Sequence, residues 1–229
     1  MKKILIATPF YEIKGYSPYI RSLMGTVQLL NASGIPWEYA ELSGDSYVER
    51  AKNRLAHEFL RSSYSHLLMI DSDLAWEPRQ ALQMILHDSE IIGGVFPCKN
   101  NWSHYPCRIH CTSDGTPLVN QNGTICAEYI PGGFVLYSRG AFERVIQVTN
   151  QYVDKSSGTD EIQFEFFRCG VINGERYGED CYFFKKYTDC GGKLELYPDI
   201  TFKHYGVKGW EGNYHEFLLK QPKPEVYDG

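Results

Sequence analysis

The chain has 229 residues, 43% of them hydrophobic and 22% charged, and a formal net charge of −5 at pH 7. This length predicts one domain with a sizeable core. The negative charge argues against nucleic-acid binding, and no apolar run reaches the roughly 20 residues that cross a bilayer. The first apolar run is too short for a secretion signal and the seven cysteines form no C-x-x-C pair. We therefore expect a cytoplasmic protein with reduced thiols.

Strands and helices alternate along the first 97 residues. This alternation predicts a parallel sheet with helices on both faces. Ligands of such sheets bind beyond the carboxyl ends of the strands. Pro18 in a first turn and Gly34 as a stop delimit the first helix. The predicted strands are 2–8, 35–42, 66–71 and 90–96, and the predicted helices are 17–33, 45–61 and 78–88.

The pattern changes after Pro97. Residues 100–139 are rich in Gly, Asn and Pro, and they contain short β-like runs of antiparallel character. Gly191 marks the end of a later helix. The predicted elements are strands at 105–111, 125–130 and 134–137, helices at 141–148 and 177–191, a polar loop at 154–160, and two short strands within 193–206.

The sequence Asp71-Ser72-Asp73 follows directly after a continuous apolar strand. Carboxylates are the ligands that Mg²⁺ and Mn²⁺ prefer, together with phosphate oxygens of a substrate. The pair therefore predicts either a metal site or simply an acidic loop at a strand end. Phosphatases of the haloacid dehalogenase type have a similar motif near the start of the chain, with Thr or Val at its fifth position. Here that position is Ala75 and the motif follows the third strand, which argues against that class.

An ordered set of motifs resembles nucleotide-sugar glycosyltransferases of the GT-A fold, in particular small single-domain viral, phage and bacterial members. The resemblance covers most of the chain and rests on "ATPFY", "ERAKNRLAHEFL", "HLLMIDSDLAWEP", "IIGGVFPCK", "YIPGGFVLYSRGAFE", "GEDCYFF" and "TFKHYG". It implies an α/β fold of the GT-A type, a Rossmann-like mixed sheet with a smaller antiparallel part. It also implies a nucleotide-binding half at 1–98 and an acceptor-binding, catalytic half at 99–229. The implied activity is transfer of a sugar from a UDP-sugar to a carbohydrate acceptor, in the host cytoplasm if the protein is viral.

The resemblance implies that Asp73 is the direct metal ligand and that Asp71 contacts the ribose or a water on the metal. Ser72 is the small spacer between them. His204, in "FKHYG", matches a late histidine that completes the metal site in relatives; the alternative is a hydrogen-bonded histidine at a strand end. Imidazole suits Mn²⁺ better than Mg²⁺, so the histidine favours manganese.

The end of the first strand corresponds to the nucleobase site of relatives, where Tyr11 would stack on uracil or else pack in the core. Asp45 would bind the base or ribose, or else cap the following helix. Arg50 and Asn53 are three residues apart on that helix and thus on one face, with Arg50 the expected diphosphate contact. Where relatives often have Arg-Asn this chain has Lys52-Asn53, which leaves the phosphate partner open. The residues expected at the nucleobase are Thr8, Pro9, Phe10 and Tyr11.

In inverting relatives the aspartate of the "GED" motif is the base that takes the proton of the acceptor hydroxyl. The resemblance thus assigns Asp180 as the base and gives Glu179 a supporting role; acidic residues also stabilise a helix start without any catalytic role. Gly132 and Gly133 would let the backbone approach the donor sugar, or else form a bulge. The residues expected to close over the diphosphate are Lys99 and Lys208, the latter with Trp210.

Two other functions compete with sugar transfer. A sugar-1-phosphate nucleotidyltransferase shares a similar half-sheet and metal carboxylates, but it would show a glycine cluster after the first strand, which "ATPFYEIKGY" lacks. A nucleotide- or sugar-binding module without turnover would bind nucleotide tightly without metal.

Overall fold

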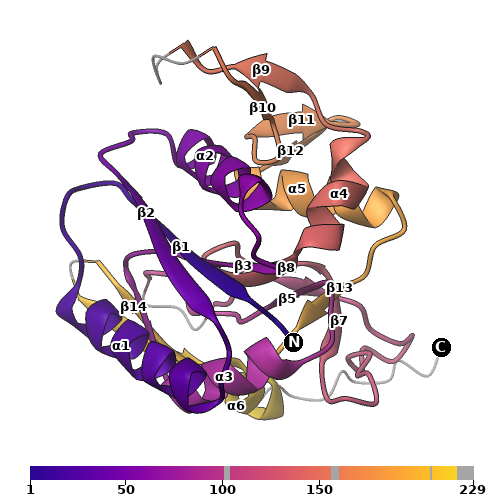
Figure 1. Cartoon of the computed structure of the whole chain (residues 1–229). Coiled ribbons are helices and arrows are strands. Elements are labelled where there is room, and N and C mark those ends of the chain that lie inside the picture. Colours follow the sequence, from indigo (N-terminus) through magenta and orange to yellow (C-terminus); the bar gives the residue numbers. More distant parts are fainter. Residues whose placement is uncertain (101–103, 156–159, 207, 221–229) are drawn as a thin grey trace.

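The computed structural model describes residues 1–100, 104–155, 160–206 and 208–220. Its centre is an eight-stranded mixed sheet with the strand order β2-β1-β3-β8-β5-β13-β7-β6 (Figure 1). The strands are β1 (Ile4–Phe10), β2 (Trp37–Ser43), β3 (His66–Ile70), β5 (Ile91–Gly93), β6 (Arg108–Ile109), β7 (Ile125–Tyr129), β8 (Phe134–Ser138) and β13 (Leu194–Leu196). The helices are α1 (Ser17–Ala32), α2 (Val48–Arg61), α3 (Pro78–Leu86), α4 (Arg139–Ile146), α5 (Glu179–Asp189) and α6 (Tyr214–Lys220).

The parallel part of the sheet confirms the strand–helix alternation. β1 pairs in parallel with both β2 and β3. β8 then enters the sheet antiparallel between β3 and β5, so β5 does not pair with the strand that precedes it in the alternation. β5 is also shorter than the predicted strand 90–96. The sheet is consequently mixed: β2, β1 and β3 are parallel, and beyond β3 the pairs are antiparallel except for the parallel pair of β5 with β13.

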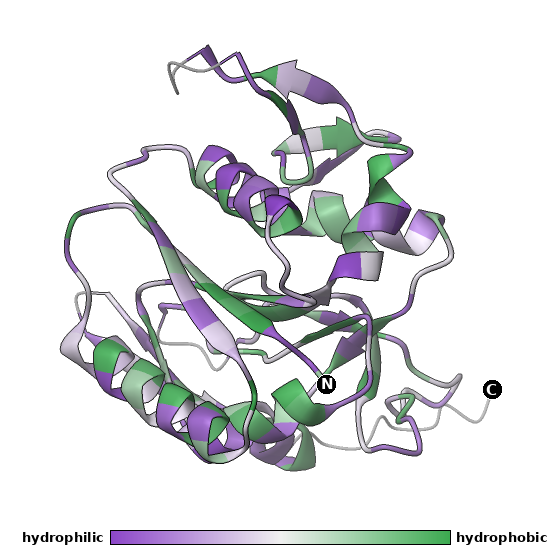
Figure 2. Cartoon of the chain, in the orientation of Figure 1, coloured by the Kyte–Doolittle hydropathy of each residue, from purple (hydrophilic) through white to green (hydrophobic). Residues whose placement is uncertain are grey.

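Alternating residues of β3 face two separate cores. Leu67 and Met69 pack with α2, α4 and α5, whereas Leu68 and Ile70 pack with α1 and α3. All four side chains are fully buried. Figure 1 shows the same division, with α2, α4 and α5 on one side of the sheet and α1 and α3 on the other. Figure 2 shows apolar strands in the middle and helices with one polar and one apolar side, as expected for a layered fold.

Smaller sheets surround this framework. The strands β4 (Leu74–Trp76), β14 (Thr201–Tyr205) and β15 (Gly209–Asn213) form a three-stranded antiparallel sheet. Two hairpins are formed by β9 (Gln151–Val153) with β10 (Ile162–Phe164), and by β11 (Gly170–Ile172) with β12 (Glu175–Tyr177). β14 places the segment around residue 204 beside the segment around residue 74, 130 positions earlier in the chain.

Several boundaries differ from the sequence expectations. The sequence also favours Ser17 as the N-cap of the first helix, but Tyr16 occupies that position and makes no side-chain cap hydrogen bond. Gly34 and Gly191 adopt positive φ as helix stops, as predicted. Most of the predicted loop at 154–160, residues 156–159, lies outside the described residues. The cysteines form no disulfide in the described chain. Among the described helices, none combines the length and apolarity of a membrane span.

Candidate functional site

A cleft lies at the carboxyl ends of β1 and β3, the edge at which ligands of such sheets bind. Its volume is about 390 Å³, within the range of small-molecule sites. Tyr11, at its mouth, is 72% exposed. The lining residues are Pro9, Phe10, Tyr11, Asp45, Ser46, Val48, Glu49, Ala51, Asp71, Ser72 and Asp73. The cleft therefore brings together seven residues that the sequence predicted at the donor site.

Backbone hydrogen bonds fix the Asp71-Ser72-Asp73 segment on both sides. The Asp71 N–H donates to the Gly133 carbonyl at 2.8 Å, just before β8. The Asp73 carbonyl accepts from the Tyr205 N–H at 2.8 Å, at the end of β14. The two acidic side chains thus stand on a rigid turn held by two sheets.

Asp73 faces two cationic or potentially cationic groups. Lys99 Nζ pairs with its Oδ2, and His204 Nε2 lies 3.6 Å from its Oδ1. Burial raises the pKa of Asp73, but the contacts with His204 and Lys99 outweigh it and lower the pKa below its ordinary value. His204 Nδ1 is 2.8 Å from the Pro97 carbonyl. Because a carbonyl only accepts, Nδ1 carries a proton and donates it to Pro97, which leaves Nε2 as the ring nitrogen that faces Asp73; metal-ligating histidines commonly donate their other ring N–H in this way.

Gly132 and Gly133 each leave room for one carboxylate. A Cβ on Gly133 would lie 2.5 Å from Asp71 Oδ2, and a Cβ on Gly132 would lie 2.4 Å from Asp180 Cβ. The Gly132 N–H donates to Asp180 Oδ2 at 2.6 Å, and the Cys181 N–H donates to Oδ1 at 2.7 Å. The double glycine therefore lets the carboxylates of Asp71 and Asp180 approach the same stretch of backbone.

A buried lysine lies beneath these carboxylates. Lys52 Nζ is 2.9 Å from Glu179 Oε1 and 4.0 Å from Asp71 Oδ1. Burial alone would lower the pKa of Lys52, but Asp71 and Glu179 raise it above its ordinary value. Burial likewise raises the pKa of Glu179, but Lys52 outweighs it and lowers the pKa. For Asp71 burial prevails and the pKa is raised, although Lys52 opposes it.

The charges around the double glycine leave a deficit of positive charge. The carboxylates of Asp71, Asp73, Glu179 and Asp180 face the ammonium groups of Lys52 and Lys99. Buried Oδ1 atoms of Asp71 and Asp73 accept no hydrogen bond within the described part of the chain. This deficit of two positive charges fits a divalent cation.

The described residues contain no cluster of three or more His, Cys, Asp and Glu side chains that could hold a metal by themselves. Asp73 and His204 are the pair that face each other. Such a pair suits a cation that takes its remaining ligands from a diphosphate and water. The residues present therefore fit Mn²⁺ or Mg²⁺ bound together with a nucleotide.

Three residues that the sequence predicted at the donor site bond to protein groups other than Asp73 and His204. Thr8 is fully buried and its hydroxyl is 2.6 Å from that of Tyr19, so it lies beneath the cleft. The Asn53 amide exchanges hydrogen bonds of 2.8 and 2.9 Å with the Phe167 backbone. Arg50, three residues earlier on the same helix, bonds elsewhere: its guanidinium makes two 2.7 Å bonds to the Asp45 carboxylate.

Asp45 accepts a backbone hydrogen bond and forms an ion pair at the same time. Its Oδ1 accepts from the Tyr47 N–H at 2.9 Å, just before α2. Burial raises the pKa of Asp45, but Arg50 and the Tyr47 N–H outweigh it and lower the pKa. The N-cap position of α2 is Tyr47 and no side chain in the described part of the chain caps the helix, so Asp45 does not cap it but fixes the turn before it and also lines the cleft.

The side chains of Lys99 and Trp210 both lie against Gly206, two residues after His204. A Cβ on Gly206 would lie 3.2 Å from atoms of each. Lys208 Nζ lies over the Trp210 ring, 5.3 Å from its centre. Residue 207 lies outside the described residues. The expected group of Lys99, Lys208 and Trp210 is therefore close together beside His204.

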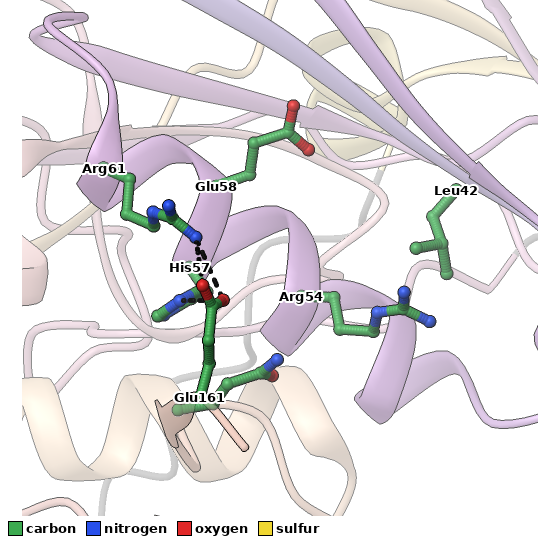
Figure 3. A pocket seen from close by; sticks show the side chains of 7 residues that line it. Leu42, Arg54, His57, Glu58, Arg61 and Glu161 are labelled. Carbon is green, nitrogen blue, oxygen red and sulfur yellow. Dashed lines mark hydrogen bonds and ion pairs between the residues drawn. The ribbon is translucent and has the colours of Figure 1, made fainter. Parts of the chain in front are cut away.

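A second hollow lies on the other face of α2, lined by the side chains in Figure 3. Arg61 makes bonds of 2.8 and 2.9 Å to the Glu161 carboxylate, and His57 Nε2 lies 3.6 Å from it. Arg54 and Glu58 complete a set of balanced charge. At 100° per residue, residues 54 to 61 of this set lie on the side of the helix opposite Lys52. This hollow contains none of the predicted site residues.

Comparison with known proteins places the fold. No family model matches the chain, and no curated protein does. Among solved structures, GalNAc-T7 with UDP, GalNAc and Mn²⁺ is similar over 93% of this chain, with 13% identity and a TM-score of 0.54. The match covers 46% of that protein, so this chain spans less than half of its length.

Two further structures are similar at TM-scores below 0.5. A Drosophila β-1,4-galactosyltransferase 7 in complex with manganese, UDP-Gal and xylobiose matches 100% of this chain and 77% of its own, with 13% identity and a TM-score of 0.49. A glycosyltransferase involved in glycosylation of the major capsid of PBCV-1 matches 62% of each chain, with 17% identity and a TM-score of 0.35. The similarity to GalNAc-T7 and the mixed eight-stranded sheet agree with the GT-A-type α/β fold that the sequence predicted.

The sequence predicted no role for Lys52 and indicated only that Lys52-Asn53 stands where relatives often have Arg-Asn. Arg50 in the first turn of α2 was predicted, but the neighbouring residues that line the cleft were missed: Ser46, Val48, Glu49 and Ala51. The one available signal was position: residues 46–51 begin the helix that follows β2, whose carboxyl end points to the same edge of the sheet.

Proposed function

We propose that this protein transfers a sugar from a UDP-sugar to a carbohydrate acceptor, with inversion, in a reaction that depends on Mn²⁺ or Mg²⁺. The observation that carries the proposal is the double glycine, which brings Asp71 and Asp180 to one stretch of backbone. A donor-side carboxylate and a candidate base thereby share one site. Residues 1–98 would bind the donor, and residues 99–229 would supply the acceptor site and the base.

On the donor side, Asp73 and His204 would hold the metal, and Asp71 would contact the ribose or a water on the metal. When bound, the metal would neutralise the negative charge that develops on the leaving diphosphate. Pro9, Phe10, Tyr11 and Asp45 would surround the nucleoside in the cleft, with exposed Tyr11 stacking on the base. Lys99, which pairs with Asp73, would turn to the diphosphate when the cation occupies the carboxylate.

On the acceptor side, Asp180 would act as the general base. Two backbone N–H groups, from Gly132 and Cys181, donate to its two carboxylate oxygens and fix its orientation. As the acceptor oxygen forms its bond to the anomeric carbon, the bond from that carbon to the diphosphate oxygen breaks and the hydroxyl proton passes to Asp180. The attack and departure on opposite faces give inversion.

The test is a screen of UDP-, GDP- and TDP-sugars for metal-dependent donor hydrolysis, followed by transfer to simple saccharides. We expect turnover with a UDP-sugar and Mn²⁺, and none after chelation. Turnover that survives chelation would contradict the metal dependence. Tight nucleotide binding without any turnover, and unaffected by chelation, would support a binding module instead.

A further inference from the structure

Lys52 is a buried lysine in the middle of a polar junction. Its side chain is 2% exposed, a rare position for a lysine unless it is paired. Its partner Glu179 is 127 positions later in the chain. Lys52 therefore joins three elements: helix α2, the turn after β3 through Asp71, and the first residue of α5.

The contact with Glu179 acts on the residue next to it. Asp180 follows Glu179 in the first turn of α5, and its Oδ2 is held by the Gly132 N–H at 2.6 Å. Without the ammonium group, the carboxylates of Asp71 and Glu179 would face each other with no buried cation between them. Like charges at close range repel, and the repulsion would move the start of α5 away from the donor side.

We propose that Lys52 is a positioning residue that fixes the first turn of α5, and with it Asp180, relative to Asp71. This inference rests on the proposed sugar transfer. A base displaced by about 1 Å can cost 100-fold in rate even when substrate still binds. A lysine that only stabilised the fold would change the unfolding free energy without changing the turnover number of the folded protein.

The test compares Lys52→Met and Lys52→Arg in the whole chain, with Arg61→Met as matched control. Arg61 lies on the opposite side of the same helix and also pairs with a distant carboxylate, Glu161. For Lys52→Met we expect kcat to fall roughly 10- to 100-fold, while KM for the UDP-sugar changes by less than about threefold. Lys52→Arg should recover most of kcat because it keeps the charge, and Arg61→Met should stay within about twofold of wild type.

The double variant Lys52→Met/Glu179→Gln tests whether the two residues act through each other. If they do, its kcat should be no lower than that of the worse single variant. Additive losses, or a Lys52→Met variant with wild-type kcat, would overturn the proposal. A change confined to KM would also overturn it, because it would indicate a donor-binding role.

Amide hydrogen exchange provides a readout that does not need turnover. In Lys52→Met, the amides of 179–182 should exchange at least about tenfold faster while those at the end of α5 keep their protection; Arg61→Met should change neither. Unchanged exchange at 179–182 would overturn the positioning role even if the wild type proved inactive. Inactive wild type with the expected exchange pattern would contradict only the proposed function.

Discussion

Replacing Gly133 by alanine would add one methyl group at the centre of the site. The new Cβ would lie 2.5 Å from Asp71 Oδ2, 2.9 Å from its Cγ and 2.8 Å from Phe96 Cζ. Gly133 does not have a positive φ among the described glycines, so the alanine backbone itself is not strained. The effect therefore comes from space alone.

The size of the effect follows from the overlap. Ordinary contacts begin near 3.4 Å, so the Asp71 carboxylate must move by roughly 1 Å. Overpacking of this kind costs about 1–3 kcal/mol of folding free energy. A carboxylate displaced by that amount should also weaken UDP binding in Mn²⁺ at least about tenfold, or about 1.4 kcal/mol.

Urea unfolding measures the first quantity, and calorimetry with UDP and Mn²⁺ measures the second. Gly140→Ala is the matched control: it lies in α4, its Cβ would meet the end of the Glu90 side chain at 3.3 Å and Ser138 Oγ at 3.8 Å, and alanine favours helix. The control should keep wild-type affinity and stability. A Gly133→Ala protein that binds UDP like wild type and loses less than about 0.5 kcal/mol would refute the steric reasoning.

Asp180→Asn should lower kcat by roughly 10²–10⁴-fold, because the base is lost, while calorimetry finds UDP affinity unchanged; wild-type turnover would exclude Asp180 as the base. Arg139 donates to four backbone carbonyls at the end of α2, so Arg139→Met should cost about 2–4 kcal/mol in urea unfolding. Burial, aided by the charge of Lys2, lowers the pKa of His66 to about 4. Its stability contribution is therefore full above pH 6.5 and falls toward pH 4, so wild type should lose roughly 1–2 kcal/mol more than His66→Gln between pH 6.5 and 5; equal losses would contradict this.

The parallel half of the fold could be predicted because its signals are local. Apolar strands alternate with amphipathic helices, and Gly34 and Gly191 stop helices at positive φ, where glycine is favoured. Pro18 and Pro78 both stand at first-turn positions. Each of these signals lies within a few residues of the structure that it determines.

The antiparallel half depends on contacts between distant segments. β8 enters between β3 and β5, and β4 pairs with β14 about 130 positions later. β4 has three residues, too few for a recognisable alternation. The strand β15 and helix α6 were also missed, because the aromatic, turn-rich sequence after Gly206 indicates no regular element.

The site residues likewise divide into those with a local sequence signal and those whose place depends on distant contacts. Asp71 and Asp73 could be expected at a strand end because the apolar run before them is visible in the sequence. Lys52 could not, since a lysine in a helix is normally exposed and its burial depends on Glu179. The spacing of Arg50 and Asn53 within "ERAKNRLAHEFL" suggested a shared face toward the donor, but their side chains bond to Asp45 and to the Phe167 backbone.

The most direct test of a metal-dependent UDP site is calorimetry of UDP binding with and without Mn²⁺. Wild type should bind UDP in Mn²⁺ and bind it at least about tenfold more weakly without it. Asp73→Asn should lose this dependence, because it removes a charged ligand beside His204. Equal UDP affinity in the presence and absence of Mn²⁺, or no binding in either, would contradict the account.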